Sequence, residues 1–196
     1  MSSYRLSVCM AGMSHRRKPF LESIRKKAPD WVEFVFDDRD GISIGAKRNS
    51  MIQKCSGEYI AVIDDDDDIT DSYFDEMLKG ISLGVHAICI RIARYIDGDL
   101  RYIRTFGAEN PYREDGDPVI PAGHFCAIRA DIVKEVGYRD LGKGEDLDHQ
   151  ARLIEHLKTA YYVPLVTYIQ YYTSRKKEYD FDQNFTTLQV SGKPQV

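Results

Sequence analysis

The 196-residue sequence lacks any apolar run near the roughly 18 residues that a membrane span needs, and no signal-peptide-like apolar block opens it. Cysteine is scarce, and no Cys-x-x-Cys pair occurs among Cys9, Cys55, Cys89 and Cys126. Each of these cysteines stands in apolar surroundings, which is typical of buried free thiols in a reducing compartment. We therefore expect a cytoplasmic protein with no transmembrane segment.

A strong excess of one charge is also lacking. The net charge is −4, so nothing draws the whole chain to nucleic acid or to a membrane surface. Basic clusters occur at 16–18, 25–27 and 175–177, and we interpret them as solvated faces, although the first follows a predicted strand and is the best candidate for a phosphate contact. The apolar content of 43% suits one globular core. We expect a single domain over 1–173, with halves at about 1–85 and 86–173, and a polar tail over 174–196.

The first half alternates between short apolar runs and segments with helical spacing. Its expected elements, in chain order and beginning with a strand, are Leu6–Met10, Phe20–Ala28, Trp31–Phe36, Ile44–Cys55, Glu58–Ile63 and Phe74–Ile81. Alternating strands and helices predict an α/β fold with a mostly parallel, Rossmann-like sheet and helices on both faces. In such sheets the ligand crevice lies outside the carboxyl ends of the strands.

The second half is less regular. We expect two strands joined by a turn at Asp97–Asp99, then a polar loop, two helices and two further strands. Their expected bounds in that order are Ala87–Tyr95, Arg101–Phe106, Glu109–Pro121, Arg129–Val136, Glu145–Leu157, Ala160–Val163 and Val166–Tyr171. The loop is long and nearly free of apolar residues, which favours a lid that covers a site, with a simple flexible connection as the alternative.

Carboxylates follow two of the predicted strands. Asp37 and Asp38 come after one, and the run Asp64–Asp68 comes after another. Neighbouring carboxylates about 4 Å apart repel by roughly 1 kcal/mol in water and by more near a buried strand. A divalent cation removes that cost, and oxygen ligands on Asp64 and Asp66 suit Mg²⁺ or Mn²⁺, which also bind substrate phosphates.

Two other classes of site share part of this pattern. An EF-hand would place its sixth and twelfth residues at Ile69 and Asp75, where glycine and glutamate are required. A phosphatase Asp-x-Asp-x-Thr motif matches Asp66, Asp68 and Thr70, but it begins two residues after the strand ends. A solvated acidic loop is the remaining alternative, and it does not explain the position directly after a buried strand.

Four blocks of sequence resemble one known family in the right order. "GAKRNSMIQKCSGEYIAVIDDDDD" (Gly45–Asp68) resembles the signature of family 2 glycosyltransferases with the GT-A fold. "LSVCMAG" and "FVFDDRDG" resemble that family's first two strands, and Phe125–Leu153 resembles its acceptor-side block. The resemblance implies the GT-A (nucleotide-diphospho-sugar transferase) fold, with a donor half at about 1–85 and an acceptor half at about 86–173. It implies an inverting transfer from a nucleotide diphosphate sugar, with a UDP-sugar as the expected donor.

The resemblance also implies roles for particular residues. Donor-binding positions match Asp37, Asp38, Arg48, Asp64 and Asp65. The metal, Mn²⁺ or Mg²⁺, is implied at Asp66 and Asp64, and the catalytic base at Asp146 with Glu145 beside it. Such a transfer needs charge neutralised on the leaving diphosphate and a carboxylate that takes the acceptor proton. Departures from the family pattern occur at "DDRDG" and "MAGMSHRRKP", in the regions expected to recognise the base.

Two histidines are further candidates on the acceptor side. His124 is expected to line the acceptor pocket, and His149 is a possible metal or acceptor ligand unless its helix face is simply polar, with Asp148 and Arg152 paired. A nucleotidyltransferase or a non-catalytic nucleotide-sugar binder on the same fold remains an alternative. The sequence leaves the oligomeric state and the acceptor open: a glycan, a small molecule and a modified nucleic-acid base all remain.

Overall fold

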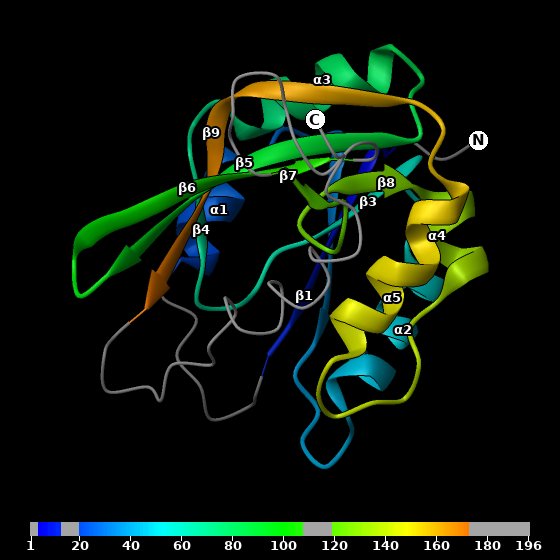
Figure 1. Ribbon diagram of the computed structural model, residues 1–196. Helices are drawn as coiled ribbons and strands as arrows, with labels where there is room; N and C mark the ends of the chain where they lie inside the picture. The colour runs from blue at the N-terminus through cyan, green and yellow to red at the C-terminus, as the bar shows by residue number, and fades with distance from the viewer. Residues whose placement is uncertain (1–3, 13–19, 108–118, 173–196) are drawn as a thin grey trace, which may run out of the picture.

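The computed structural model describes residues 4–12, 20–107 and 119–172. The basic clusters at 16–18 and 175–177, the predicted tail and all but the last three residues of the predicted lid lie outside these described residues. The described part forms an α/β fold around one central sheet (Figure 1). None of the described helices is long and apolar enough to cross a membrane.

The first half folds in the predicted alternating order. Its elements are β1 (Leu6–Ala11), α1 (Leu21–Lys27), β2 (Val32–Asp37), α2 (Ile44–Lys54), β3 (Tyr59–Val62), β4 (Asp68–Ile69) and α3 (Tyr73–Ser82). β1 and β3 are buried along their whole length, as expected for strands covered on both faces. Ser43 caps α2 by accepting a hydrogen bond from the Ala46 amide.

The second half is built mainly of strands. Its elements are β5 (Ala87–Ile96), β6 (Asp99–Gly107), β7 (Val119–Pro121), β8 (Ala127–Arg129), α4 (Ala130–Val136), α5 (Glu145–Leu153), the 3₁₀ turn η1 (Ile154–His156) and β9 (Ala160–Tyr172). The predicted hairpin between β5 and β6 is confirmed, with positive φ angles at Asp97 and Gly98. The sequence missed the short strands β4, β7 and β8.

Several predicted boundaries are wrong. The last three residues of the predicted lid form β7, which pairs with β6 in parallel. The two strands predicted within 160–171 are one strand, β9, which continues through Pro164 with register irregularities against β5. α3 begins at Tyr73, one residue before the predicted start of this helix, and its N-cap position is Ser72. Short strands and boundaries depend on pairing between distant segments, which local periodicity does not report.

The sheet order is β2-β1-β3-β8-β5-β6-β7, with β9 pairing alongside β5 and with β4. β1 pairs in parallel with β2 and with β3, and β5 pairs in parallel with β9. These three pairings contain most of the paired residues of the sheet. β8 runs antiparallel between β3 and β5. The carboxyl ends of β1, β2 and β3 therefore share one edge of the sheet. The Val62 amide donates to the His124 carbonyl there, at 3.2 Å, which brings the second half to the same edge.

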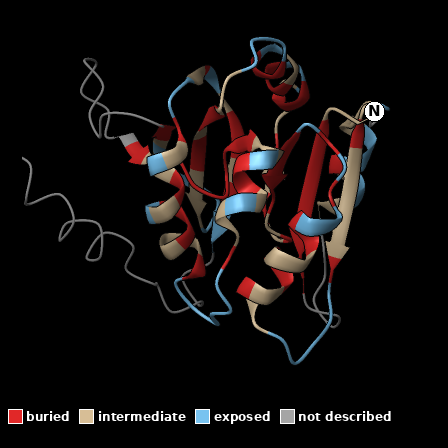
Figure 2. Cartoon of the chain, turned by 90° about the vertical axis from the view of Figure 1, so that its right-hand side faces the viewer, coloured by how far each residue is buried: buried red, intermediate tan, exposed pale blue. Residues whose placement is uncertain are grey.

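Helices cover both faces of the sheet (Figures 1 and 2). α2, α4 and α5 lie together on one side, and the buried side chains form a continuous core between helices and sheet. α1 packs on the opposite face of β2, where Arg25 stacks over Phe34 and Phe36. Gly45 lets α2 approach the chain before α5, because a Cβ at this position would lie 2.0 Å from the Arg139 carbonyl oxygen. This close approach brings the start of α5 to α2, and both helices supply residues to the site.

Candidate functional site

The carboxylates predicted at strand ends lie at the shared edge of the sheet. Asp37 ends β2 and is buried, and Arg39 donates to it through Nε at 2.9 Å. The hydrogen bonds from Arg39 hold the pKa of Asp37 below its usual range, although burial opposes them. Asp38, the next residue, is exposed. Asp37 therefore fixes the local chain by its bond to Arg39, and Asp38 presents its side chain to solvent.

Arg48 connects the two halves of the molecule. Its side chain is buried on α2, donates to Asp64 Oδ1 at 3.0 Å and to Glu145 Oε1 at 2.7 Å, and lies over the Tyr138 ring. Burial alone would lower the pKa of Arg48, but the surrounding negative charges, Asp64 foremost, raise it above its ordinary value. Arg48 is therefore a fixed positive charge between the end of β3 and the start of α5. Arg48 stands four residues from both Ile44 and Ile52, and this helical spacing in the sequence places it on their inward face, in agreement with its burial.

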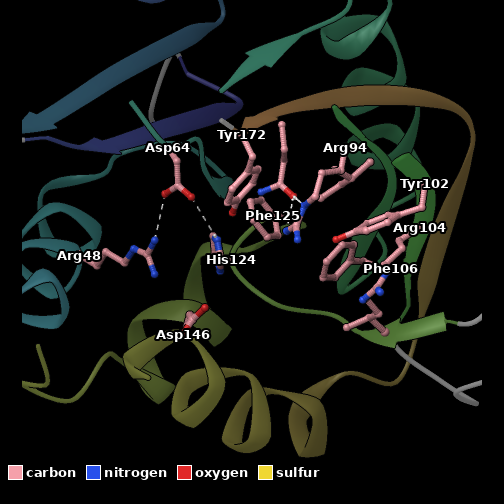
Figure 3. A pocket seen from close by; sticks show the side chains of 13 residues that line it. Arg48, Asp64, Arg94, Tyr102, Arg104, Phe106, His124, Phe125, Asp146 and Tyr172 are labelled. Atoms are coloured by element: carbon pink, nitrogen blue, oxygen red, sulfur yellow. Dashed lines mark hydrogen bonds and ion pairs between the residues drawn. The ribbon is translucent and has the colours of Figure 1, made fainter. Parts of the chain in front are cut away.

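Asp64 is the carboxylate on which this arrangement converges. Its backbone amide donates to Tyr168 Oη at 3.1 Å, and its Oδ2 lies 3.7 Å from His124 Nε2. Burial would raise the pKa of Asp64, but His124 and Arg48 together lower it. Figure 3 shows Asp64 between these two side chains at one side of a pocket. Asp64 is thus held as an ionised carboxylate.

Protein groups contact two further carboxylates of the acidic run, Asp67 and Asp68. Asp67 is buried and accepts from Tyr168 Oη at 2.9 Å and from Gln170 Nε2 at 3.3 Å, and its pKa is raised by burial and then by Asp64 and Asp66. Asp68 lies 3.7 Å from Lys27 Nζ. Tyr168, Gln170 and Lys27 therefore offset part of the repulsion between the carboxylates, which the sequence analysis expected a divalent cation to remove. Asp64 and Asp66 are the carboxylates of the run whose chemistry bears on a metal ion.

A divalent ion fits the carboxylates only if the substrate completes its coordination. Within 4–12, 20–107 and 119–172, no three His, Cys, Asp or Glu side chains gather as a metal-binding group. Mg²⁺ sites in nucleotide enzymes commonly use one or two carboxylates together with substrate phosphates. Asp64 and the half-buried Asp66 provide such a pair of hard oxygen donors at the end of β3. The residues therefore fit an ion that is bound jointly with a diphosphate.

A pocket of about 110 Å³ opens beside Asp64 (Figure 3). Asp146, at the start of α5, lines it together with Arg48, Asp64 and His124. The volume is below the roughly 300–1,000 Å³ of sites that enclose a whole small ligand, so this pocket suits one part of a nucleotide sugar or its acceptor. A smaller neighbouring pocket shares Asp146 and His124 and extends toward Leu147 and Gln150.

The adjacent acids Glu145 and Asp146 have different surroundings. Glu145 is buried against Arg48, and its pKa is raised by burial, which Arg48 partly opposes. Glu145 does not line the pocket, whereas Asp146 does. The structure therefore gives the predicted base Asp146 access to a ligand and gives Glu145 a contact that positions Arg48.

The two candidate histidines also separate. His124 lines the pocket, as expected. His149 is buried away from it and stacks on Tyr138, with the ring centroids 3.9 Å apart. Burial lowers the pKa of His149 to about 3, so the ring is neutral. Arg152 donates to Asp148 at 2.7 Å, in agreement with the alternative reading of a paired helix face. The structure therefore does not bring His149 to the ligand side.

Sequence reasoning missed the far wall of the pocket. Three neighbouring strands, β5, β6 and β9, contribute alternate residues to it: Ile92, Arg94, Tyr102, Arg104, Phe106, Gln170 and Tyr172. The sequence did contain one sign of this wall. Side chains of a strand alternate between its two faces, so Tyr102, Arg104 and Phe106 of the predicted hairpin must share one face. Which face meets the site depends on how the hairpin packs, and the hairpin's own sequence does not show that.

The comparisons with known proteins agree on the class of protein. The chain matches the family described as glycosyl transferase family 2 over residues 18–137, and it belongs to that family. No curated protein sequence matches it. Among solved structures it resembles S. aureus TarS 1–349 in complex with UDP-GlcNAc, with a TM-score of 0.62 and 13% identity, over 89% of this chain and 60% of that one. A197 from STIV is also similar, with a TM-score of 0.51 and 16% identity, over 85% of this chain and 82% of that one.

These likenesses confirm the predicted GT-A fold and its family. The chain spans about 60% of the TarS fragment in that complex. At such low identity the solved structures show the fold alone.

Proposed function

We propose that this protein is an inverting glycosyltransferase that moves a sugar from a UDP-sugar to an acceptor hydroxyl. The observation that carries the proposal is that Asp146 and the ionised Asp64 line one pocket in a chain of this family. The fold-mate TarS has been solved with UDP-GlcNAc and with UDP, which supports a uridine diphosphate donor.

The three carboxylates Asp64, Asp66 and Asp146 have separate tasks in this proposal. Asp66 and Asp64 would hold Mn²⁺ or Mg²⁺, and the bound ion would supply Lewis acidity for the leaving diphosphate. Asp146 takes the proton of the acceptor hydroxyl, whose oxygen attacks the anomeric carbon. The bond between that carbon and the diphosphate oxygen breaks, and its electron pair leaves with the nucleoside diphosphate. One displacement inverts the anomeric centre and requires no protein nucleophile.

Arg48 has a supporting task on the donor side. Its charge lies 3.0 Å from Asp64 and is held in place by Glu145, so it is positioned before a ligand arrives. A fixed cation beside the predicted diphosphate position stabilises negative charge as the donor bond breaks. Asp38, exposed at the end of β2, is the donor-base contact in this proposal, with Asp37 fixing its backbone.

Incubation with nucleotide sugars and Mn²⁺ tests the proposal directly. We expect release of UDP from a UDP-sugar, faster when an acceptor is present, and an inverted anomeric configuration in the product by NMR. Release of pyrophosphate from a nucleoside triphosphate and a sugar phosphate would identify a nucleotidyltransferase instead. Tight binding of the nucleotide sugar with no release under any condition would identify a non-catalytic binder.

A further inference from the structure

The four cysteines of the chain lie in two touching pairs. All four are buried free thiols, as the sequence predicted. Cys9 on β1 and Cys55, which follows the last residue of α2, have their Sγ atoms 3.2 Å apart. In the second half of the molecule, Cys89 of β5 forms a hydrogen bond with Cys126. Each thiol therefore contacts another thiol, which is the first requirement for a disulfide bond.

The contact between Cys9 and Cys55 is close to the geometry of a disulfide. The two residues are 46 positions apart in the chain, and β1 and α2, whose packing brings them together, are in contact. An S–S bond is about 2.05 Å long, so the two sulfur atoms must approach each other by roughly 1 Å. A shift of this size lies within the range of side-chain motion in a folded protein. The folded chain therefore holds this pair ready for cross-linking.

The two thiols of this pair differ in access and in reactivity. Cys9 lies within β1 and is 0% exposed. Cys55 is also buried, but it follows the end of a helix, and its chain neighbours Lys54 and Ser56 are exposed. Helix ends fray more readily than a buried strand opens. The hydrogen bond with Cys9 lowers the pKa of Cys55, against the effect of burial, and raises the pKa of Cys9. Because the thiolate is the nucleophile, Cys55 is the thiol that reacts first.

Cys89 and Cys126 make the same kind of contact without that access. Their chain neighbours on both sides are buried, and neither cysteine is more than 1% exposed. A reagent in solution reaches them only when the core opens. The second pair is therefore an internal comparison, in which two thiols touch but an oxidant has no way in.

We propose that Cys9 and Cys55 are a redox-active pair, which a low-molecular-weight disulfide such as oxidised glutathione converts into an intramolecular disulfide. The Cys55 thiolate attacks one sulfur of the oxidant, the S–S bond of the oxidant breaks, and one glutathione leaves with the electron pair and takes up a proton. Cys9 then loses its proton and attacks the Cys55 sulfur of the mixed disulfide, which releases the second glutathione. The two protein thiols lose two electrons, and the oxidant is reduced to two thiols.

The bridge fastens the end of α2, the helix that carries Arg48, to β1. In a reducing compartment the pair stays as two thiols, and it responds when the ratio of disulfide to thiol rises. The inference does not depend on the proposed function, since it concerns only the contact between the two sulfurs and the access to Cys55.

Thiol mapping of the folded protein tests the proposal. The wild-type chain is incubated with oxidised glutathione, the remaining thiols are alkylated in denaturant, and the peptides are mapped by mass spectrometry without reduction. We expect a peptide that links Cys9 to Cys55, whereas Cys89 and Cys126 are recovered as alkylated thiols. The linked protein should melt about 5–15 °C higher than the reduced protein, because a closed loop restricts the unfolded chain, and dithiothreitol should reverse the shift.

Three variants separate the roles of the thiols. Cys55→Ala should abolish the reaction at this pair, and Cys9→Ala should leave a mixed disulfide between Cys55 and glutathione. Cys89→Ala is the matched control, in which the link between Cys9 and Cys55 should form as in the wild type. A wild type that gains no such link, or that links Cys89 to Cys126 equally fast, overturns the inference even where a variant fails to fold. A linked protein that melts no higher than the reduced one also overturns it, because the bridge would then not fit the native packing.

Discussion

The proposed donor half, at about residues 1–85, and the proposed acceptor half, at about 86–173, place their polar side chains in opposite ways. In the donor half, Asp37 and Asp64 stand at the ends of parallel strands, where the chain leaves the sheet. In the acceptor half, Arg94, Arg104 and Tyr172 stand along the strands themselves and face the pocket from the sheet. Side chains at strand ends can be brought together on paper from the strand order alone. Side chains along a strand can be assigned to a site only when it is known which face of the sheet packs against that site.

The two halves should also fail differently when their carboxylates are changed. Asp146→Asn, in the acceptor half, removes the proposed base but keeps the shape of the side chain. We expect kcat to fall by about 10²- to 10⁴-fold, while UDP affinity stays within about twofold, because the base acts only when the proton moves. Steady-state kinetics and calorimetry measure the two effects. Glu155→Gln, an exposed change shortly after the same helix, is the control. Equal losses of UDP affinity and turnover would contradict the assignment of Asp146.

A carboxylate of the donor half should show the reverse pattern. Asp66→Ala, or a chelator added to the wild type, is expected to lower UDP affinity by about tenfold or more, because a divalent ion joins the carboxylate to the diphosphate. Calorimetry with Mn²⁺ and with chelator measures it. Asp71→Ala is the matched control, since the Asp71 side chain is 95% exposed. If UDP binds equally well with and without chelator, the metal assignment is wrong.

The junction between the halves should affect stability more than chemistry. Glu145→Ala removes one of the two carboxylates that hold the buried Arg48, and breaking such a pair costs about 3 kcal/mol. We expect a matching fall in the free energy of unfolding in urea, with partial recovery in Glu145→Gln, whose amide oxygen still accepts a hydrogen bond. Full stability with lost turnover in Glu145→Ala would instead make Glu145 a catalytic residue.

The elements of the donor half were predictable because its signals are local. Apolar strands, helical spacing and the ending of strands at Asp37 and Asp64 are all visible in short windows of sequence. The inward position of Arg48 followed from its spacing of four from Ile44 and Ile52. The resemblance to a known family then gave these residues their expected roles.

The acceptor half was harder for physical reasons. β8 has three residues and is stabilised by β3 and β5, which are far away in the chain, so no local pattern marks it. The same difficulty reaches into the donor half, where the burial of Asp67 depends on Tyr168 and Gln170, about a hundred residues later. The difference between Glu145 and Asp146 depends on which of two adjacent side chains turns toward Arg48. Each of these outcomes is decided by tertiary packing and not by propensity.

His149 offers the last and smallest test of the comparison, because it belongs to the acceptor half but not to the pocket. The folded state keeps its pKa at about 3, against an ordinary value near 6.5 in the unfolded chain. Between these values the unfolded chain binds the extra proton, so the free energy of unfolding falls as the pH drops below about 6.5. At pH 5 the loss from this group is about 2 kcal/mol relative to pH 7.5.

His149→Phe should remove that loss. Phenylalanine can keep the stacking on Tyr138, and neither His149 ring nitrogen has a hydrogen-bond partner among the described residues. Urea unfolding at pH 7.5 and pH 5.0 measures the difference between variant and wild type, and His156→Phe, on the turn that follows α5, is the control. We expect the pH dependence to become shallower only in His149→Phe, with turnover unchanged. An unchanged pH dependence would contradict this account of His149. Lost sugar transfer in a stable variant would show that His149 takes part in the function of the acceptor half.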